Sequence, residues 1–201
     1  MERTVTDSPE QESLIARMRR RRVTREFTAD AVTEEQLRLI VEGGRWASSA
    51  SNMRIHKYVL VTDRALIDRV SVVSPGIYGR PPALIVICTD LQRCRDVGLE
   101  PQSDRSSYVD VGTSLMNMLL MAQDLRLGAC PVTSFSQRAA SVLLDLPESL
   151  IPELLVLVGH PAPRRRVVRA GAPASLTVED LTFIATRDRG LQPLSLNSRS
   201  Q

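Results

Sequence analysis

The sequence predicts an α+β fold or an α/β sandwich, in which helices pack around one central sheet. Four short apolar segments have the length and composition of buried strands, at residues 57–62, 83–89, 129–132 and 153–158. Helical patterns separate these segments, and the longest pattern, over residues 110–126, is apolar nearly all round its axis. With 201 residues, the chain is long enough to bury a substantial core in one such domain.

Composition narrows the class of protein. Hydrophobic residues make up 43% and aromatic residues 3%, so the core must be mostly aliphatic, and the formal net charge of +3 is mild. No apolar run approaches the roughly 18 residues that a membrane span needs. The polar, acidic N-terminus does not resemble a signal peptide. We therefore expect a soluble, cytoplasmic protein that has no membrane partner.

The cysteines are also typical of a cytoplasmic protein. Cys88, Cys94 and Cys130 are odd in number and lack the spacing of a metal site. Two of them lie in apolar runs, and only His56 and His160 could add imidazole ligands. We expect three reduced thiols, with Cys94 exposed, and no bound metal.

In the first half of the chain, helix-capping residues and residues that interrupt helices and strands indicate where the elements begin and end. A polar stretch at residues 1–10 should be disordered. Thr33 and Gln36 form a capping box, which starts a helix that runs to about Trp46. Two further helices are expected at residues 11–20 and 65–71. Loops rich in small residues, glycine or proline follow at residues 47–52 and 74–82.

The second half continues the alternation of helices and strands. Residues 90–104 are polar and should form an irregular connector or lid. The long helix ends at Leu127-Gly128, and a small-residue loop at 133–136 follows the next strand. Shorter helices are expected near residues 137–144 and from Thr177. We expect one domain over residues 11–186 and a flexible C-terminal tail over residues 187–201.

A cluster of arginines stands near the N-terminus. Arg21, Arg22 and Arg25 are close enough in sequence for a bend to converge two or three guanidinium groups on one phosphate dianion. A solvated basic face is the simpler interpretation. Nucleic-acid binding is disfavoured because no aromatic residues are interleaved with the basic ones.

Two small-residue loops are candidate ligand sites. The loop at 133–136 leaves backbone N–H groups available along one edge, which would suit a flat heteroaromatic ligand. The turn at 47–52 carries Ser49 and Asn52, whose side chains can hydrogen-bond. A plain connector and a capping turn are the simpler interpretations.

Several familiar catalytic motifs are absent. There is no G-x-G-x-x-G after a strand, no Walker loop and no serine elbow. Neither His56 nor His160 has an evident acid partner by spacing. A cofactor would therefore have to supply the chemistry.

Several separated segments match one known pattern in the right order. Arg21-Arg22-Val23-Thr24-Arg25-Glu26-Phe27 resembles the R-R-S-x-R-x-F opening, and residues 47–52 resemble the A-P-S-x-x-N turn, of the nitroreductase family of FMN enzymes. Asp110, Asn117 and the Leu127-Gly128 stop resemble its D-x(6)-N-L-L-L-A-A…G-L-G segment. Leu146-Pro147 and Gly159-His160-Pro161 match later markers, so the resemblance spans roughly residues 14–185.

The resemblance implies a cofactor and roles for particular residues. The expected fold is a nitroreductase-like sandwich with a mixed or antiparallel sheet and a long central helix. Asn52 and Ser49 would meet the isoalloxazine edge, and the N–H groups of Thr133 and Ser134 would face N5 and O4. The complete expected FMN-binding set is Arg21, Arg22, Val23, Arg25, Ser49, Asn52, Pro131, Val132, Thr133, Ser134, Arg166 and Arg169.

The resemblance also implies a homodimer with FMN at its interface. Such a dimer would explain why the long helix is apolar nearly all round, although a core helix in a monomer remains an alternative.

Three departures from the family pattern bear on substrate preference. Val23 replaces a serine, Ser48 replaces the proline of A-P-S, and Arg54-Ile55-His56 replaces Q-P-W.

The expected activity is hydride transfer from NADPH or NADH through flavin N5 to a nitroaromatic, quinone or conjugated acceptor. Arg54, Tyr78 and Tyr108 are candidates for the substrate pocket. The segments at 74–79 and 130–135 also resemble the flavin subunit of cyclodipeptide oxidases, which work with a small partner protein. A flavin-binding protein without turnover is a further alternative.

Overall fold

The computed structural model describes residues 13–100, 105–163, 176–187 and 190–193. The chain divides into two compact units, Met1–Arg164 and Arg165–Gln201. Arg166 and Arg169, both expected to bind the cofactor, lie outside the described residues.

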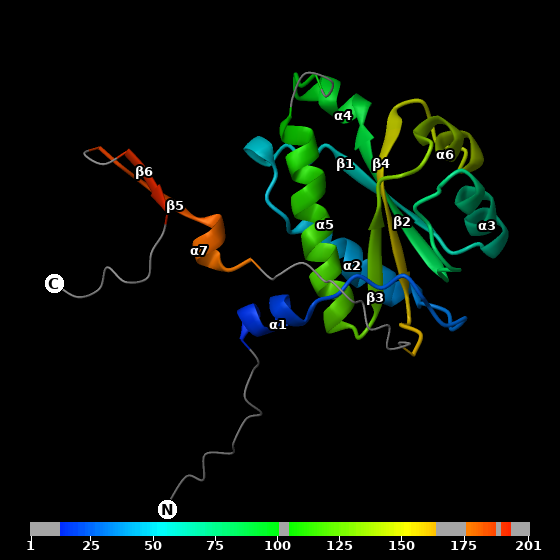
Figure 1. The fold of residues 1–201 in the computed structure, drawn as a ribbon. Helices are drawn as coiled ribbons and strands as arrows, with labels where there is room; N and C mark the ends of the chain where they lie inside the picture. The colour runs from blue at the N-terminus through cyan, green and yellow to red at the C-terminus, as the bar shows by residue number, and fades with distance from the viewer. Residues whose placement is uncertain (1–12, 101–104, 164–175, 188–189, 194–201) are drawn as a thin grey trace, which may run out of the picture. The chain divides into compact units, whose positions relative to one another are not determined.

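A four-stranded sheet forms the centre of the first unit (Figure 1). Its strands are β1 (His56–Val61), β2 (Ala83–Asp90), β3 (Gly128–Val132) and β4 (Leu150–Gly159). They lie in the order β1-β2-β4-β3, and every neighbouring pair is antiparallel. The sheet is therefore the antiparallel form of the predicted fold.

Alternating side chains of the central strands fill two separate cores. Ile85 and Val156 belong to the core beneath α2 (Glu34–Arg45) and α5 (Ser106–Asp124). Leu84 and Leu155 face the opposite core, which contains residues of α3 (Arg64–Val72) and α6 (Gln137–Leu143). Because β2 and β4 are buried on both faces, they appear in the sequence as continuous apolar runs rather than alternating ones.

Helices α2 and α5 make the closest contact between helices. A Cβ atom on Gly44 would lie 2.5 Å from Met118 Cε and 2.8 Å from Ser114 Oγ, so a larger residue there would force one of these side chains to shift. Asn117 Nδ2 donates to the Gly43 carbonyl over 3.1 Å. The predicted capping box is formed, with Gln36 N–H donating to Thr33 Oγ1 over 3.1 Å.

The expectation of an irregular segment at 90–104 is wrong for its first part. Leu91–Asp96 forms helix α4, because the Asp90 carboxylate accepts hydrogen bonds from the N–H groups of Gln92 and Arg93. This helix buries Cys94, which was expected to be exposed. Helix α5 also begins at Ser106, before the expected start at Asp110.

The segment after α1 (Leu14–Arg20) lies along the free edge of β3. Thr24 N–H donates to the Ala129 carbonyl over 3.0 Å, and Gly128 approaches the Thr24 side chain so closely that a Cβ would collide with it. Farther along, Phe27 forms an isolated bridge with Pro161. The N-terminal arginines are thereby held beside the sheet.

The second unit contains α7 (Val178–Leu181) and a hairpin of β5 (Phe183–Thr186) and β6 (Gly190–Pro193). A capping box between Thr177 and Asp180 starts α7, as the sequence predicts. Strand β6 lies within residues 187–201, for which the sequence predicts a flexible tail.

Candidate functional site

The arginine segment, residues 21–27, contains two guanidinium groups that have no partner among the described residues. Neither Arg21 nor Arg25 forms an ion pair or a side-chain hydrogen bond within residues 13–100, 105–163, 176–187 and 190–193. Arg22 differs, because its Nη1 donates to the carbonyls of Arg19 and Arg21. Val23 packs against the core on the α3 and α6 face. Arg21 and Arg25 are therefore the arginines best able to meet an anion.

The loop after β3 lies beside this segment. Gly76 N–H donates to the Ser134 carbonyl over 3.1 Å, and a Cβ on Gly79 would lie 2.9 Å from the Arg25 carbonyl. Burial raises the pKa of the Cys130 thiol in β3, and the positive charge of Arg25 opposes that shift. The loop at 74–80 thus contacts both Arg25 and the loop after β3.

The backbone of this loop offers hydrogen-bond donors. Pro131 is tolerated in β3 because β3 is an edge strand, where a missing N–H costs no ladder bond. Among the described residues, no hydrogen bond uses the N–H of Thr133 or Ser134. Val132 is buried, whereas both of these residues are exposed. The edge therefore carries two donors that a ligand could accept from.

The turn that carries Ser49 and Asn52 lies elsewhere. It forms the 3₁₀ turn Ala50–Asn52 and contacts α5, where Ala50 N–H donates to both oxygens of Asp110 at 3.1 Å. The arginine segment follows α1, whose Arg17 forms an ion pair with Asp124 at the other end of α5. Asp124 lies fourteen positions after Asp110 in the helix, a rise of about 21 Å. One chain does not bring the two predicted halves of the site together.

The three pocket candidates are also spread over the molecule. Arg54 Nε donates to Asn52 Oδ1 over 2.9 Å, so Arg54 belongs to the same turn. Tyr108 is 65% exposed near the start of α5, and Tyr78 is 61% exposed in the loop beside Arg25. Arg54 thus belongs with the turn, Tyr108 lies near the end of α5 that the turn contacts, and Tyr78 lies in the loop that contacts Arg25.

A small cavity of about 70 Å³ lies beneath the turn. Ser49 Oγ and His56 Nε2 are both buried there without a hydrogen-bond partner among the described residues. Tyr58 Oη bonds to Ser114 Oγ over 2.8 Å, and Asp110 completes the wall. Burial lowers the pKa of His56, opposed by the charge of Asp110, and burial raises the pKa of Tyr58.

Sequence reasoning assigned no role to most of this cavity. In the sequence, Asp110 stands out only as part of a motif, and Tyr58 and Ser114 have no local signal, because they come from distant elements. His56 could have been found from the sequence, since it replaces the tryptophan of the Q-P-W pattern.

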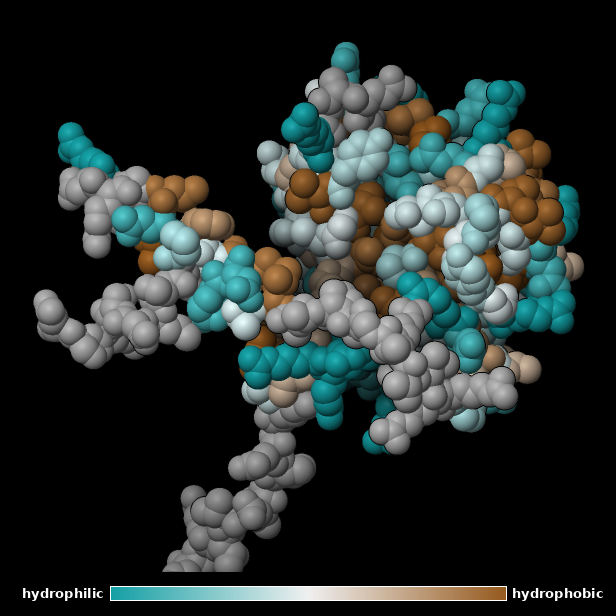
Figure 2. Space-filling view, viewed as in Figure 1, coloured by the Kyte–Doolittle hydropathy of each residue, from teal (hydrophilic) through white to brown (hydrophobic). Residues whose placement is uncertain are grey.

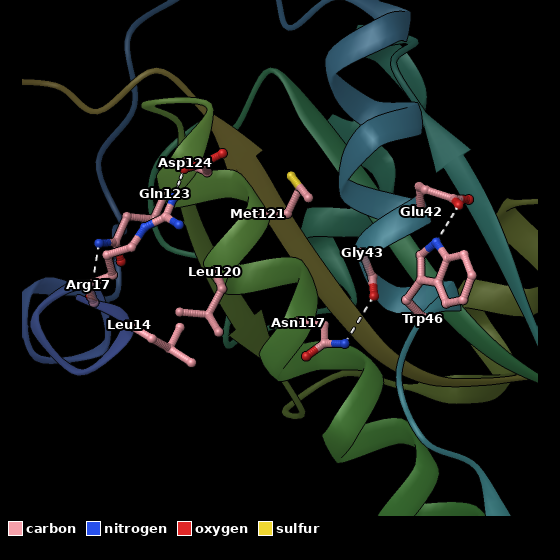
Figure 3. Close-up of a pocket in the computed structure, with 10 residues that line it drawn as sticks. All are labelled: Leu14, Arg17, Glu42, Gly43, Trp46, Asn117, Leu120, Met121, Gln123 and Asp124. Atoms are coloured by element: carbon pink, nitrogen blue, oxygen red, sulfur yellow. Dashed lines mark hydrogen bonds and ion pairs between the residues drawn. The ribbon is translucent and has the colours of Figure 1, made fainter. Parts of the chain in front are cut away.

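A larger groove of about 430 Å³ lies between α1, α2 and α5 (Figure 3). Trp46 is 68% exposed and donates from Nε1 to Glu42 over 2.7 Å, while Leu14 is 61% exposed. Leu120 and Met121 of α5 add further apolar lining. In the space-filling view, apolar side chains also reach the surface over the region of α5 (Figure 2).

Comparison with protein-family models decides the family. Residues 18–76 and 71–160 match the model described as the nitroreductase family. The chain belongs to the nitroreductase family. The resemblance inferred from the sequence motifs is confirmed, because the matched ranges contain the arginine segment, the Ser49 turn and the loop after β3.

Curated relatives agree with this assignment. The nitroreductase-family chain is 30% identical over 168 residues to an NADPH-flavin oxidoreductase of Vibrio harveyi, covering 79% of this chain and 70% of that protein. It is 30% identical over 169 residues to an oxygen-insensitive NADPH nitroreductase of Salmonella typhimurium, with the same coverage of 79% and 70%. An FMN reductase [NAD(P)H] of Bacillus subtilis is 27% identical over 158 residues, 71% of this chain and 64% of the relative.

Solved structures agree on the fold. NfrA1 of B. megaterium superposes with a TM-score of 0.71 at 22% identity, over 86% of this chain and 74% of that chain. An FMN-dependent nitroreductase from Clostridium difficile superposes with a TM-score of 0.65 at 18% identity, over 78% and 92%. These likenesses confirm the predicted nitroreductase-like α+β fold.

The residues present fit the cofactor that this family implies. A flavin mononucleotide offers a phosphate dianion at one end and hydrogen-bonding ring edges at the other. Arg21 and Arg25 supply unpaired cations, and Thr133, Ser134 and the Ser49 hydroxyl supply polar groups without partners among the described residues. The described residues contain no cluster of side chains that could hold a metal ion, and no helix that could cross a membrane.

Proposed function

We propose that this chain is an FMN-dependent NAD(P)H oxidoreductase of nitroreductase type. The observation that carries the proposal lies near the edge of β3, where the unpaired Arg25 and two free backbone N–H donors border the same loop at 74–80 in a chain of this family. Relatives whose names specify NADPH, FMN or flavin support the choice of cofactor and reductant.

The chain's own residues would bind and orient the cofactor. Arg21 and Arg25 would hold the phosphate, with Arg22, Arg166 and Arg169 as further candidates. Bound FMN would supply hydride transfer between a nicotinamide and an acceptor. The N–H groups of Thr133 and Ser134, preorganised by Gly76 and by β3, would stabilise negative charge on the flavin ring. Val23, Pro131 and Val132 would shape the binding surface beside them.

We propose further that two copies of the chain form each site. The Ser49–Asn52 turn and the arginine segment lie toward opposite ends of α5 in one chain. Antiparallel packing of α5 against its copy about a two-fold axis would place the turn of one protomer near the arginines of the other. The apolar groove between α1, α2 and α5 supports this choice of face.

Nitroaromatics, quinones or conjugated compounds would be the acceptors, with Arg54, Tyr78 and Tyr108 lining the substrate pocket. No described side chain is required as a nucleophile, which is consistent with the absence of the catalytic motifs. The three buried cysteines form no disulfide among the described residues, which supports a cytoplasmic location, where thiols stay reduced.

A visible spectrum of the purified protein, followed by anaerobic titration with NADPH and NADH, tests the function. We expect a yellow protein whose flavin absorbance is bleached by one or both nicotinamides and restored by a quinone. A colourless protein that takes up no added FMN would refute the proposal. Retained flavin without bleaching would indicate a binding protein, and oxidation of cyclic dipeptides in air would indicate the cyclodipeptide oxidase alternative.

A further inference from the structure

The turn between α2 and β1 is held in an unfavourable backbone conformation. Ser51, Asn52 and Arg54 have φ angles of 47°, 55° and 50°, although none of them is glycine. Residues with side chains adopt this left-handed region at a cost in free energy, and such strain persists only where surrounding contacts fix it. Contacts from neighbouring elements must therefore hold the turn in this conformation.

One buried carboxylate makes the central contact. The Asp110 side chain comes from the first turns of α5, and Asp110 is 7% exposed. Its two oxygens each lie 3.1 Å from the N–H of Ala50, which stands between Ser49 and the strained residues. A buried carboxylate commonly needs several hydrogen-bond donors. Among the described residues, the Ala50 N–H is the donor that bonds to the Asp110 side chain.

Within the turn, the Asn52 N–H donates to the Ser49 carbonyl over 3.0 Å. Two further side chains from outside the turn reach its flanks. Thr113 Oγ1, one turn further along α5, donates to the Ser48 carbonyl over 3.1 Å. Arg93 Nε donates to the Met53 carbonyl over 3.2 Å. Neither touches the peptide that joins Ser49 to Ala50. Because that peptide is planar, fixing the Ala50 N–H also fixes the Ser49 carbonyl and the position of the Ser49 Cα atom, from which the Ser49 side chain starts.

We propose that Asp110 is a positioning residue, which holds the strained turn so that Ser49 and Asn52 present their polar groups to the bound flavin. This inference rests on the proposed function. It predicts that the acceptor oxygen of Asp110 matters for flavin affinity even though Asp110 reaches the flavin only through Ala50. The carboxylate thus links the start of α5 to the cofactor site.

Substitutions of similar size separate this role from general destabilisation. Asp110→Asn keeps an acceptor oxygen, whereas Asp110→Leu removes it. Ala50→Pro removes the same donor without changing α5, and Ser49 at φ −135° and ψ 150° already has the extended backbone that a following proline requires. Thr113→Val is the matched control, because it deletes a neighbouring hydrogen bond from the same helix.

The experiment measures the dissociation constant of FMN by fluorescence titration of the apoprotein, and tryptic cleavage after Arg54 without flavin. We expect D110L and A50P to raise the dissociation constant at least tenfold and to speed cleavage. D110N and T113V should stay within threefold of the wild type. If D110L does not fold, A50P tests the same contact.

Wild-type affinity in both D110L and A50P would overturn the proposal. An equal loss in T113V would overturn it as well, because the effect would then be general loosening of the turn. Failure of the wild-type protein to bind FMN would instead refute the proposed function, so the two failures are distinguishable.

Discussion

At the scale of single residues, neighbouring arginines with the same side chain have different surroundings. Arg22 is occupied by backbone carbonyls, whereas Arg21 and Arg25 are unpaired among the described residues. A charge-assisted hydrogen bond contributes about 1.5–3 kcal/mol. Loss of both unpaired groups in the double variant R21A/R25A should therefore weaken FMN binding at least about 100-fold.

Fluorescence titration of the double variant with FMN checks this prediction. Arg38→Ala is the matched control, because Arg38 pairs with Glu34 on an exposed face of α2 and should leave the dissociation constant unchanged. Arg22→Ala should have a smaller effect than either unpaired arginine. Full flavin content in R21A/R25A would remove the phosphate clamp from the proposed function.

His56 should make the stability of the protein depend on pH. Burial lowers its pKa in the folded state, so the unfolded chain takes up a proton first as the pH falls below about 6.5. The stabilisation is complete above that pH and is lost as the pH falls through the lower pKa of the folded state. Asp110 opposes the shift, and Arg45, Arg54 and Tyr58 also line the cavity.

Urea unfolding of the apoprotein between pH 5 and pH 8 measures this dependence. The free energy of unfolding of wild type should fall more steeply below about pH 6.5 than that of His56→Leu. His160→Gln, which lies outside the cavity, should retain the wild-type profile. Parallel profiles for wild type and H56L would show that His56 does not titrate differently on folding.

At the scale of elements, the contact between α2 and α5 depends on one glycine. A Cβ on Gly44 would meet Met118 and Ser114, which α5 holds in the buried interface. Overpacking of this kind costs about 1–3 kcal/mol, which exceeds the gain in helix propensity of about 1 kcal/mol. Gly44→Ala should therefore lower the free energy of unfolding.

Gly112 of α5 provides the opposite case. A Cβ there would meet no atom of the described residues within 4 Å, so Gly112→Ala should raise the free energy of unfolding by about 0.5–1 kcal/mol. Chemical denaturation of both variants tests the pair. A stabilising G44A would mean that the helices can separate without loss.

The elements that the sequence predicted correctly are those with strong local signals. The capping box at Thr33 and the apolar runs of β2 and β4 were sufficient. Helix α4 was missed because its six residues carry charge and little apolar period, and only the side chain of Asp90 starts it. The tertiary contact between Asp110 and Ala50, sixty residues apart, had no local signal at all.

At the scale of the whole molecule, the motifs predicted the family and the candidate residues but not their arrangement. The sequence alone shows Ser49 and Arg25 as parts of one pattern. The structure places them with different ends of α5, which the linear order of motifs cannot reveal. The proposed function therefore depends on the proposed homodimer, because Ser49 and Arg25 of one chain lie too far apart to meet one cofactor. The dimer can be tested separately.

A charge placed in the groove should prevent the proposed dimer from forming. Leu120 lines the groove between α1, α2 and α5, so Leu120→Arg would bury an unpaired cation in the interface. We expect sedimentation velocity to show a dimer for wild type and a monomer for L120R, with FMN lost from the monomer. Val142→Arg is the matched control, because Val142 is 74% exposed on α6, a helix of the opposite face of the sheet. A dimeric L120R that keeps its flavin would place the interface elsewhere, and a monomeric wild type with bound FMN would show that one chain suffices.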